Sequence, residues 1–172
     1  MTIRLRLLDE VSCDGVPVAG ARPADLLAVL ALNSTGVADH RLVEDVWGDD
    51  RPAVPGKALQ VLVSRVRAQL GADALARADG GYRLLVEPDA VDAWVLDRSV
   101  EEASRALADG RATEAVVLAE VAAGLLDGVR DTSGDGALAG LRRAARGHTS
   151  AVRRTLGLAL SRVGRDAAAL AC

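Results

Sequence analysis

The stretch KALQVLVSRVRAQL, residues 57–70, decides the fold of this sequence and the place of its chemistry. On a helical wheel at about 100° per residue, one side of the stretch is an unbroken apolar stripe that must face a core. That stripe consists of Leu59, Leu62, Val63, Val66 and Leu70. The opposite side is cationic, offers hydrogen-bonding groups and has small residues near its centre; it carries Lys57, Gln60, Val61, Ser64, Arg65, Arg67 and Ala68.

The charge around this helix is one-sided, because four basic residues and no acidic one lie between Arg51 and Leu70. An arginine on such a face can pair bidentately with the edge of a guanine, whereas Lys57 and Ser64 suit phosphate oxygens. The same pattern also fits an ordinary solvated helix face. The wheel alone therefore leaves both interpretations open.

The residues before this stretch predict a hairpin and two further helices. An Asp14-Gly15 turn marks the hairpin, and a helix with apolar spacing begins near Pro23. A second helix runs from about Asp39, its expected N-cap, through Trp47 to Gly48. Trp47 itself is expected in the core.

The residues after the stretch predict a second hairpin with a basic tip. Residues 75–86 form two short strands around a Gly80-Gly81 turn, with Arg77 on one strand and Arg83 on the other. Three helices followed by such a hairpin have the order of a winged helix, which places one helix in the major groove and the hairpin near the DNA backbone or minor groove.

Past Pro88 the pattern is purely helical. Helices are predicted over residues 92–108, 113–126 and 149–163, with a loop from Asp127 to Gly140, and a loose repeat resembles tetratricopeptide units. The fold class expected is therefore α+β: a winged helix-turn-helix domain in residues 1–90, then an all-α tetratricopeptide-like helical repeat domain in residues 91–172. We expect the chain to continue past Cys172 or to end in a short helix.

Trp94 and a basic run belong to this helical part. Trp94 is expected to pack where the two domains meet, with a ligand-binding role as the less favoured alternative. The basic run consists of Arg142, Arg143, Arg146, Arg153 and Arg154. A solvated helix face is the favoured interpretation of this run, ahead of a second contact with nucleic acid.

Composition excludes several classes of protein. Only 2% of the 172 residues are aromatic, which argues against base stacking on single-stranded nucleic acid. Two cysteines and two distant histidines build no metal or catalytic set, so we expect no enzyme and no cofactor. The sequence has no apolar run long enough for a membrane span and no signal peptide at its start, which predicts a cytoplasmic protein with no membrane partner.

Several motifs resemble those of a known family. Residues 58–70 resemble the recognition helix of OmpR-type winged-helix regulators, residues 42–48 (LVEDVWG) resemble their second helix, and Gly81-Tyr82-Arg83 resembles their wing. The leading hairpin and the helices from Asp92 onward resemble the bacterial transcriptional activation domain. The whole chain is thus similar to the Streptomyces antibiotic regulatory protein family.

This resemblance implies a sequence-specific regulator, an activator of secondary-metabolite genes. It would bind double-stranded promoter DNA at direct repeats as a homodimer and contact RNA polymerase. The DNA-binding residues expected from the wheel, the hairpin and the resemblance are Lys57, Gln60, Val61, Ser64, Arg65, Arg67, Arg77 and Arg83. The resemblance implies that Arg65 contacts a base, that Arg67 and Lys57 contact phosphates, that Ser64 contacts a phosphate or a base edge, and that Arg83 is the wing arginine.

The sequence also departs from the family pattern. Leu62 stands where the family often has His, and Leu126-Asp127-Gly128 stands where Trp usually precedes Gly. Because Met1 opens directly on the first strand, we expect no receiver domain before the winged helix. The alternative function is a protein-interaction adaptor that does not bind DNA, or the sensing module of a longer regulator.

Overall fold

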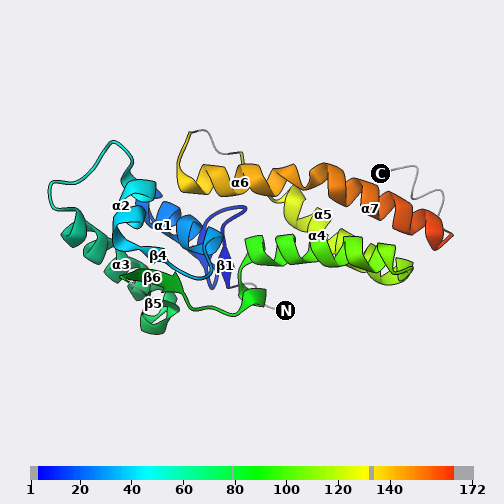
Figure 1. The fold of residues 1–172 in the computed structure, drawn as a ribbon, viewed down its shortest axis with the longest axis horizontal. Coiled ribbons are helices and arrows are strands. Elements are labelled where there is room, and N and C mark those ends of the chain that lie inside the picture. The colour runs from blue at the N-terminus through cyan, green and yellow to red at the C-terminus, as the bar shows by residue number, and fades with distance from the viewer. Residues whose placement is uncertain (1–3, 79, 132–133, 165–172) are drawn as a thin grey trace.

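The structure, a computed structural model, describes residues 4–78, 80–131 and 134–164. Within these ranges it contains seven α-helices and two small antiparallel sheets of three strands each. The molecule is elongated, with three of these helices and one sheet at one end and the other four helices at the other end (Figure 1). The expected mixture of helices with small sheets is confirmed.

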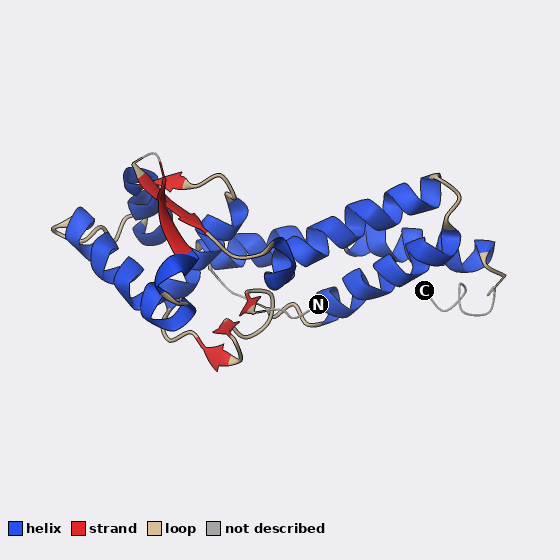
Figure 2. Ribbon diagram, turned by 90° about the horizontal axis from the view of Figure 1, so that it is seen from below, coloured by secondary structure: helices blue, strands red, loops and turns tan. Residues whose placement is uncertain are grey.

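The first sheet lies near the middle of the molecule (Figure 2). It consists of β1 (Leu5–Arg6), β2 (Ser12–Cys13) and β3 (Val16–Pro17), in that order. At the turn between β2 and β3 both Asp14 (φ 47°) and Gly15 (φ 80°) have positive φ. Asp-Gly pairs favour this conformation, which matches the twist of the flanking strands, and the predicted hairpin is confirmed.

The second sheet and three helices form one end. The helices are α1 (Ala21–Leu32), α2 (Asp39–Trp47) and α3 (Pro55–Leu70), and the sheet has the order β4-β6-β5, with β4 (Val37–Ala38), β5 (Leu75–Ala78) and β6 (Gly81–Leu84). A short 3₁₀ turn, η1 (Ala72–Ala74), joins α3 to β5. The buried residues of α3 are the five of the predicted apolar stripe.

Two details of this end correct the sequence expectations. Asp39 is not the N-cap of α2, because the cap is Ala38 and no side chain bonds there; the Asp39 carboxylate accepts hydrogen bonds from Arg77 instead. Gly81 does not belong to the turn either, because it pairs with Ala38 in the sheet. A Cβ at Gly81 would lie 1.8 Å from the carbonyl oxygen of Val37, so the close approach of β4 requires glycine there.

The other end is helical. After a 3₁₀ turn, η2 (Pro88–Ala90), it contains α4 (Asp92–Ala108), α5 (Ala112–Asp127), α6 (Ala137–Gly147) and α7 (Thr149–Arg162). The predicted helices over 92–108, 113–126 and 149–163 are confirmed to within one or two residues. The expected loop up to Gly140 is too long, because α6 already begins at Ala137, where the N–H of Leu138 donates to the carboxylate of Asp25 on α1 at 3.1 Å.

A single main core runs through both ends. It includes Leu5 of β1, Leu30 of α1, Leu96 of α4 and Leu141 of α6, and a second, smaller cluster joins the far ends of α4, α5 and α7. The domain division after residue 90 therefore stays a prediction, and so does the tetratricopeptide-like repeat. The expected continuation at the C-terminus lies outside the described residues. None of the described helices combines the length and apolarity needed to cross a membrane.

Asp92, at the start of α4, binds the segment that follows β1. Both of its carboxylate oxygens accept the N–H of Leu7 at 2.9 Å, one accepts the N–H of Leu8 at 3.0 Å, and the other accepts the N–H of Ala93 at 2.8 Å. Burial raises the pKa of Asp92, although the three backbone donors act in the opposite direction. The start of the helical end is thereby fixed to the first strand.

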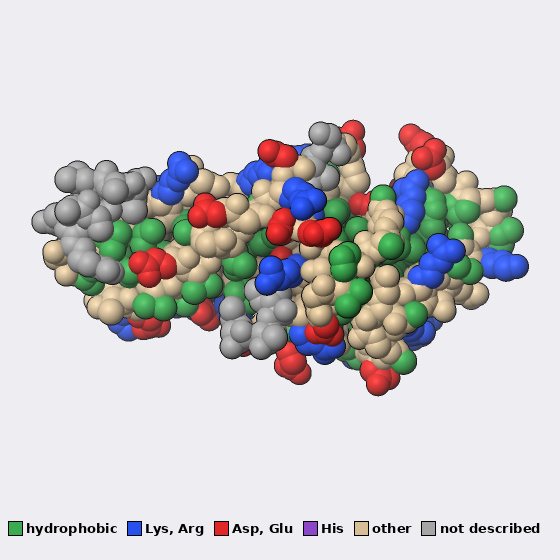
Figure 3. Space-filling model, turned by 180° about the vertical axis from the view of Figure 1, so that it is seen from behind, with side chains coloured by type: hydrophobic (Ala, Val, Ile, Leu, Met, Phe, Trp, Pro, Cys, Tyr) green, Lys and Arg blue, Asp and Glu red, His purple; other side chains and the backbone are tan. Residues whose placement is uncertain are grey.

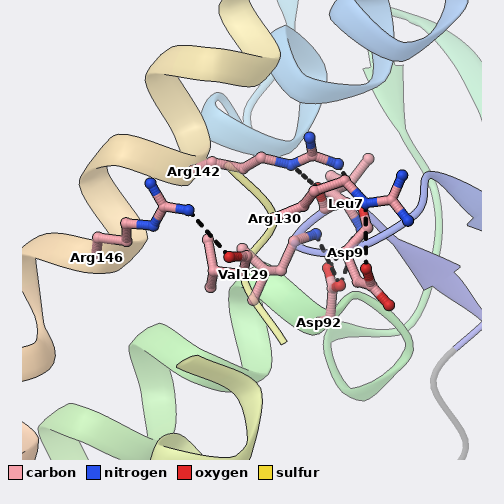
Figure 4. A network of polar contacts seen from close by, with 8 residues as sticks. Leu7, Asp9, Asp92, Val129, Arg130, Arg142 and Arg146 are labelled. Carbon is pink, nitrogen blue, oxygen red and sulfur yellow. Dashed lines mark hydrogen bonds and ion pairs between the residues drawn. The ribbon is translucent and has the colours of Figure 1, made fainter. Parts of the chain in front are cut away.

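Arg142 of α6 reaches the same segment (Figure 4). Its Nε donates to the carbonyl oxygen of Leu7 at 2.9 Å and its Nη2 donates to that of Asp9. The side chain is 5% exposed, and burial lowers its pKa. The solvated face expected for the basic run is therefore wrong for Arg142, because α6 covers residues 7–9. The contact between the two ends of the molecule is called here the joint. Trp94 packs at the joint, where its Nε1–H donates to the carbonyl oxygen of Ala31 at 2.6 Å.

Candidate nucleic-acid interface

The solvent-facing side of α3, called here the outer face, carries the cations singled out from the sequence. Its exposed residues include Lys57, Gln60, Val61, Ser64, Arg65 and Ala68. Helix α3 contains no carboxylate, and within residues 4–78, 80–131 and 134–164 no side chain pairs with Lys57 or Arg65. These two cations are therefore available to a partner.

The structure places the outer face at the tip of the molecule. Figure 3 shows basic side chains interspersed with hydrophobic ones over this end. Val61 is 46% exposed and lies between Lys57 and Arg65, one helical turn from each. An apolar contact flanked by two unpaired cations is thus the arrangement that α3 offers.

Arg67, unlike Lys57 and Arg65, is bound to other groups of the protein. Its Nε and Nη2 donate to the carbonyl oxygen of Leu75 at 3.2 and 2.7 Å, and its guanidinium carbon lies 5.7 Å from the centre of the Tyr82 ring. These contacts tie α3 to the β5–β6 hairpin. The side chain expected to contact a phosphate is thus engaged within the protein, and its contact with DNA stays a prediction.

Arg77 is also engaged. Its Nη1 donates to both carboxylate oxygens of Asp39, at 2.8 and 3.0 Å, and its guanidinium lies 4.5 Å from the Tyr82 ring centre. The hydrogen bond that Arg77 donates to the Asp39 carboxylate raises the pKa of Arg77. The ion pair neutralises this cation locally, so Arg77 contributes less positive potential than the sequence suggests.

Arg83 remains exposed on the hairpin. It faces Ala76 across the β5–β6 ladder, and no described residue pairs with its guanidinium. Successive strand residues point to opposite faces, so Tyr82, which is 7% exposed, points toward the core while Arg83 points outward. The buried tyrosine therefore anchors the strand that presents Arg83.

Two hollows flank Arg65 of α3. One, of about 450 Å³, is called here the α2–α3 hollow and is lined by Arg22, Trp47, Val54, Lys57, Ala58, Val61, Leu62 and Arg65. The other, of about 510 Å³, lies between α3 and the start of α1. Arg22 lines both hollows and was not expected from the sequence.

Arg22 connects α1 to the end of α2. Its Nη1 donates to the carbonyl oxygen of Val46 and its Nη2 lies 3.4 Å from a carboxylate oxygen of Asp50. Nothing in the pattern around Arg22 signals this role, because its partners lie on another helix and the following loop. The arrangement can hold an anion beside an apolar surface, and no cluster of metal-binding side chains occurs in the described parts of the chain.

Comparison with known proteins finds similarity both in sequence and in structure. The chain is 31% identical over 103 residues to regulatory protein AfsR of Streptomyces griseus, a match that covers 60% of this chain and 11% of that protein. Its fold is similar to that of Mycobacterium tuberculosis EmbR in complex with a low affinity phosphopeptide. That similarity has a TM-score of 0.62 at 20% identity and covers 98% of this chain and 57% of the EmbR chain. No family model matches the chain.

These matches bear on different questions. The similarity to AfsR indicates distant homology to a Streptomyces regulatory protein, and the similarity to EmbR establishes a shared fold. The chain spans about a tenth of the length of AfsR and somewhat more than half of EmbR.

Proposed function

We propose that this chain is the DNA-binding part of a transcription regulator related to the Streptomyces antibiotic regulatory protein family. Residues 1–90 would be a winged helix-turn-helix domain that inserts α3 into the major groove of promoter DNA. The observation that supports this most is the outer face of α3, where Lys57 and Arg65 lie exposed without a carboxylate on the helix. The homology to a regulatory protein supports it independently.

Different side chains of the outer face would contact bases and phosphates. Arg65 would pair with a guanine edge, since a guanidinium can donate to both O6 and N7 of that base. Lys57 and Ser64 would contact phosphates or, for Ser64, a base edge, and Gln60 could pair with adenine. Arg83 would contact the backbone or the minor groove from the hairpin.

Arg67 and Arg77 receive a different role in this proposal. Their bonds to Leu75 and Asp39 support a function in positioning the hairpin against α3 and α2. A hairpin held in this way would keep Arg83 at a fixed distance from the helix in the groove. Neither side chain then needs to contact DNA.

The helical part would supply the remaining contacts. We propose that residues 91–172 form an activation domain that contacts RNA polymerase, and that two chains bind direct repeats together. Residues 1–90 contain ten basic and thirteen acidic side chains, so binding to arbitrary DNA should be weak. Pairing on adjacent half-sites would then be needed for useful affinity.

A binding selection followed by a salt series tests the proposal. A random duplex library is passed over the immobilised chain, the enriched duplex is titrated by fluorescence anisotropy, and a scrambled duplex is the control. We expect a preferred sequence and an affinity whose logarithm falls linearly with the logarithm of salt concentration. If no sequence is enriched, or if the affinity does not change with salt concentration, the chain works as a protein-interaction adaptor instead.

A further inference from the structure

The α2–α3 hollow combines two properties that duplex recognition alone does not require. Its lining is mostly apolar, with Trp47 from the end of α2, Val54 from the loop before α3, and Ala58, Val61 and Leu62 from α3. Val54 is 61% exposed and Val61 is 46% exposed, so two large apolar side chains border the hollow uncovered. Burying them under an apolar molecule would be favourable.

The charged groups that line the hollow are all cations. They are Arg22, Lys57 and Arg65, and no carboxylate is among the lining residues. The Arg22 guanidinium is steadied by Val46 and Asp50, whereas no described side chain pairs with Lys57 or Arg65. An occupant with a negative group would therefore find two cations that no side chain of the described residues neutralises.

We propose that the α2–α3 hollow binds a small amphipathic anion, a molecule with an apolar body and one carboxylate or sulfonate group. The apolar body would cover Val61 and contact Trp47, and the acidic group would pair with Lys57 or Arg65. The volume of about 450 Å³ lies within the range of about 300 to 1,000 Å³ typical of small-molecule sites. Inorganic phosphate lacks the apolar body, and a neutral hydrocarbon lacks the charge, so both should bind weakly.

Occupancy would have a regulatory consequence, which rests on the proposed function. Lys57, Val61 and Arg65 line the hollow and also form the outer face of α3 proposed to enter the major groove. One face cannot contact both a bound anion and DNA. The ligand would therefore compete with DNA and release the regulator from its promoter.

Fluorescent naphthalene probes test the site itself. The anionic probe is 8-anilinonaphthalene-1-sulfonate, and the neutral control is N-phenyl-1-naphthylamine, which has the same rings without the sulfonate. We expect saturable binding of the anionic probe at one site on the full chain, and at least about fivefold weaker binding of the neutral one. Equal affinities would overturn the proposed role of the cations.

Matched variants locate the site. Val61→Asp places a carboxylate in the hollow and should weaken the anionic probe at least about tenfold, whereas Val117→Asp is the control at a residue of α5 that is 57% exposed. Lys57→Gln should weaken it about fivefold, and Arg153→Gln on α7 should leave it unchanged. All four positions lie outside the buried core, so folding should persist, which circular dichroism checks. If both aspartate variants or neither weakens the probe, the site is elsewhere.

A competition experiment separates this inference from the proposed function. The probe is added to the complex of the chain with its selected duplex, and DNA release is followed by anisotropy. Release at probe concentrations near its affinity supports competition, and a stable ternary complex overturns it. If the chain binds no DNA but Val61→Asp still removes the probe, the proposed function fails while the ligand site stands; if DNA binds and the probe does not, the ligand site fails alone.

Discussion

The outer face of α3 and the joint between the two ends both depend on arginine, but in opposite surroundings. Arg65 is exposed and unpaired by any described residue, whereas Arg142 is 5% exposed and donates to two backbone carbonyls. Each lies on an amphipathic helix, at a position that the sequence pattern favours for solvent. The difference arises because residues 7–9 cover α6 at that point, while nothing in the described structure covers the outer face of α3.

The comparison shows what a cation on a helix can do in each setting. At the joint the arginine donates to the carbonyl of the buried Leu7 and to that of Asp9, so it stabilises the fold. On α3 the arginine contributes nothing comparable to the fold and is free for a partner. Substitution should therefore separate the two: changes at the joint should lower stability, and changes on the outer face should lower binding.

The largest effect is expected at the joint. Arg142→Ala removes the donors to Leu7 and Asp9 and leaves the carbonyl of the buried Leu7 without this partner, which should lower the free energy of unfolding by about 3 kcal/mol. Urea unfolding followed by circular dichroism measures this. The control is Arg143→Ala, an exposed neighbour whose loss should change stability by less than about 0.5 kcal/mol. Equal losses for the two variants would contradict the distinction.

The next effect concerns the outer face. Arg65→Ala should cost about 1 to 3 kcal/mol of binding to the preferred duplex and relax the preference at one base pair, because a bidentate contact to a base edge is lost. Its stability should stay close to that of the wild type. Titration against duplexes changed at single positions measures the effect. A uniform loss on every duplex would make Arg65 a phosphate contact.

Arg67 lies on α3 like Arg65 but, like Arg142, donates to a backbone carbonyl, so its substitution tests whether it acts in folding or in DNA binding. Arg67→Ala removes two hydrogen bonds to Leu75 and the contact with Tyr82, so stability should fall by about 1 kcal/mol. DNA affinity should fall modestly without any change in its salt dependence, because a positioning side chain releases no counterions. If the salt dependence instead weakens by one charge, Arg67 contacts a phosphate as the family resemblance implies.

Much of the fold could be predicted because its signals are local. The apolar stripe of α3 follows from a period of about 3.6 residues, and the Asp14-Gly15 turn follows from the backbone preferences of those two residues. The start of helix α6 is predicted too late because this helix follows a stretch rich in Gly and Asp. Its first turn is stabilised by Asp25, a residue 113 positions away, which no local pattern reports.

The candidate site was predictable to a similar degree. The exposure of Lys57 and Arg65 follows from the helical wheel, and the structure bears it out. The partners of Arg67 and Arg77 do not follow, because they depend on how the hairpin packs against α2 and α3. Arg22 could not be found for the same reason, since it meets the end of α2 only in the folded chain.

The smallest effect is expected at the hairpin. Arg83 projects from β6 beside the buried Tyr82, outside the helix that would lie in the groove, so it should act through its charge and not through base recognition. Arg83→Ala should weaken binding to all duplexes by a similar factor and lower the salt slope by about one unit, with the preferred site unchanged.

Arg83→Lys should restore most of this loss. If the guanidinium enters a narrow minor groove, however, lysine will substitute poorly and the loss will be greater on A·T-rich flanks. Titrating both variants at two salt concentrations, on A·T-rich and G·C-rich flanks, distinguishes these outcomes. An unchanged affinity for Arg83→Ala would mean that the hairpin does not touch DNA and would leave α3 as the sole contact.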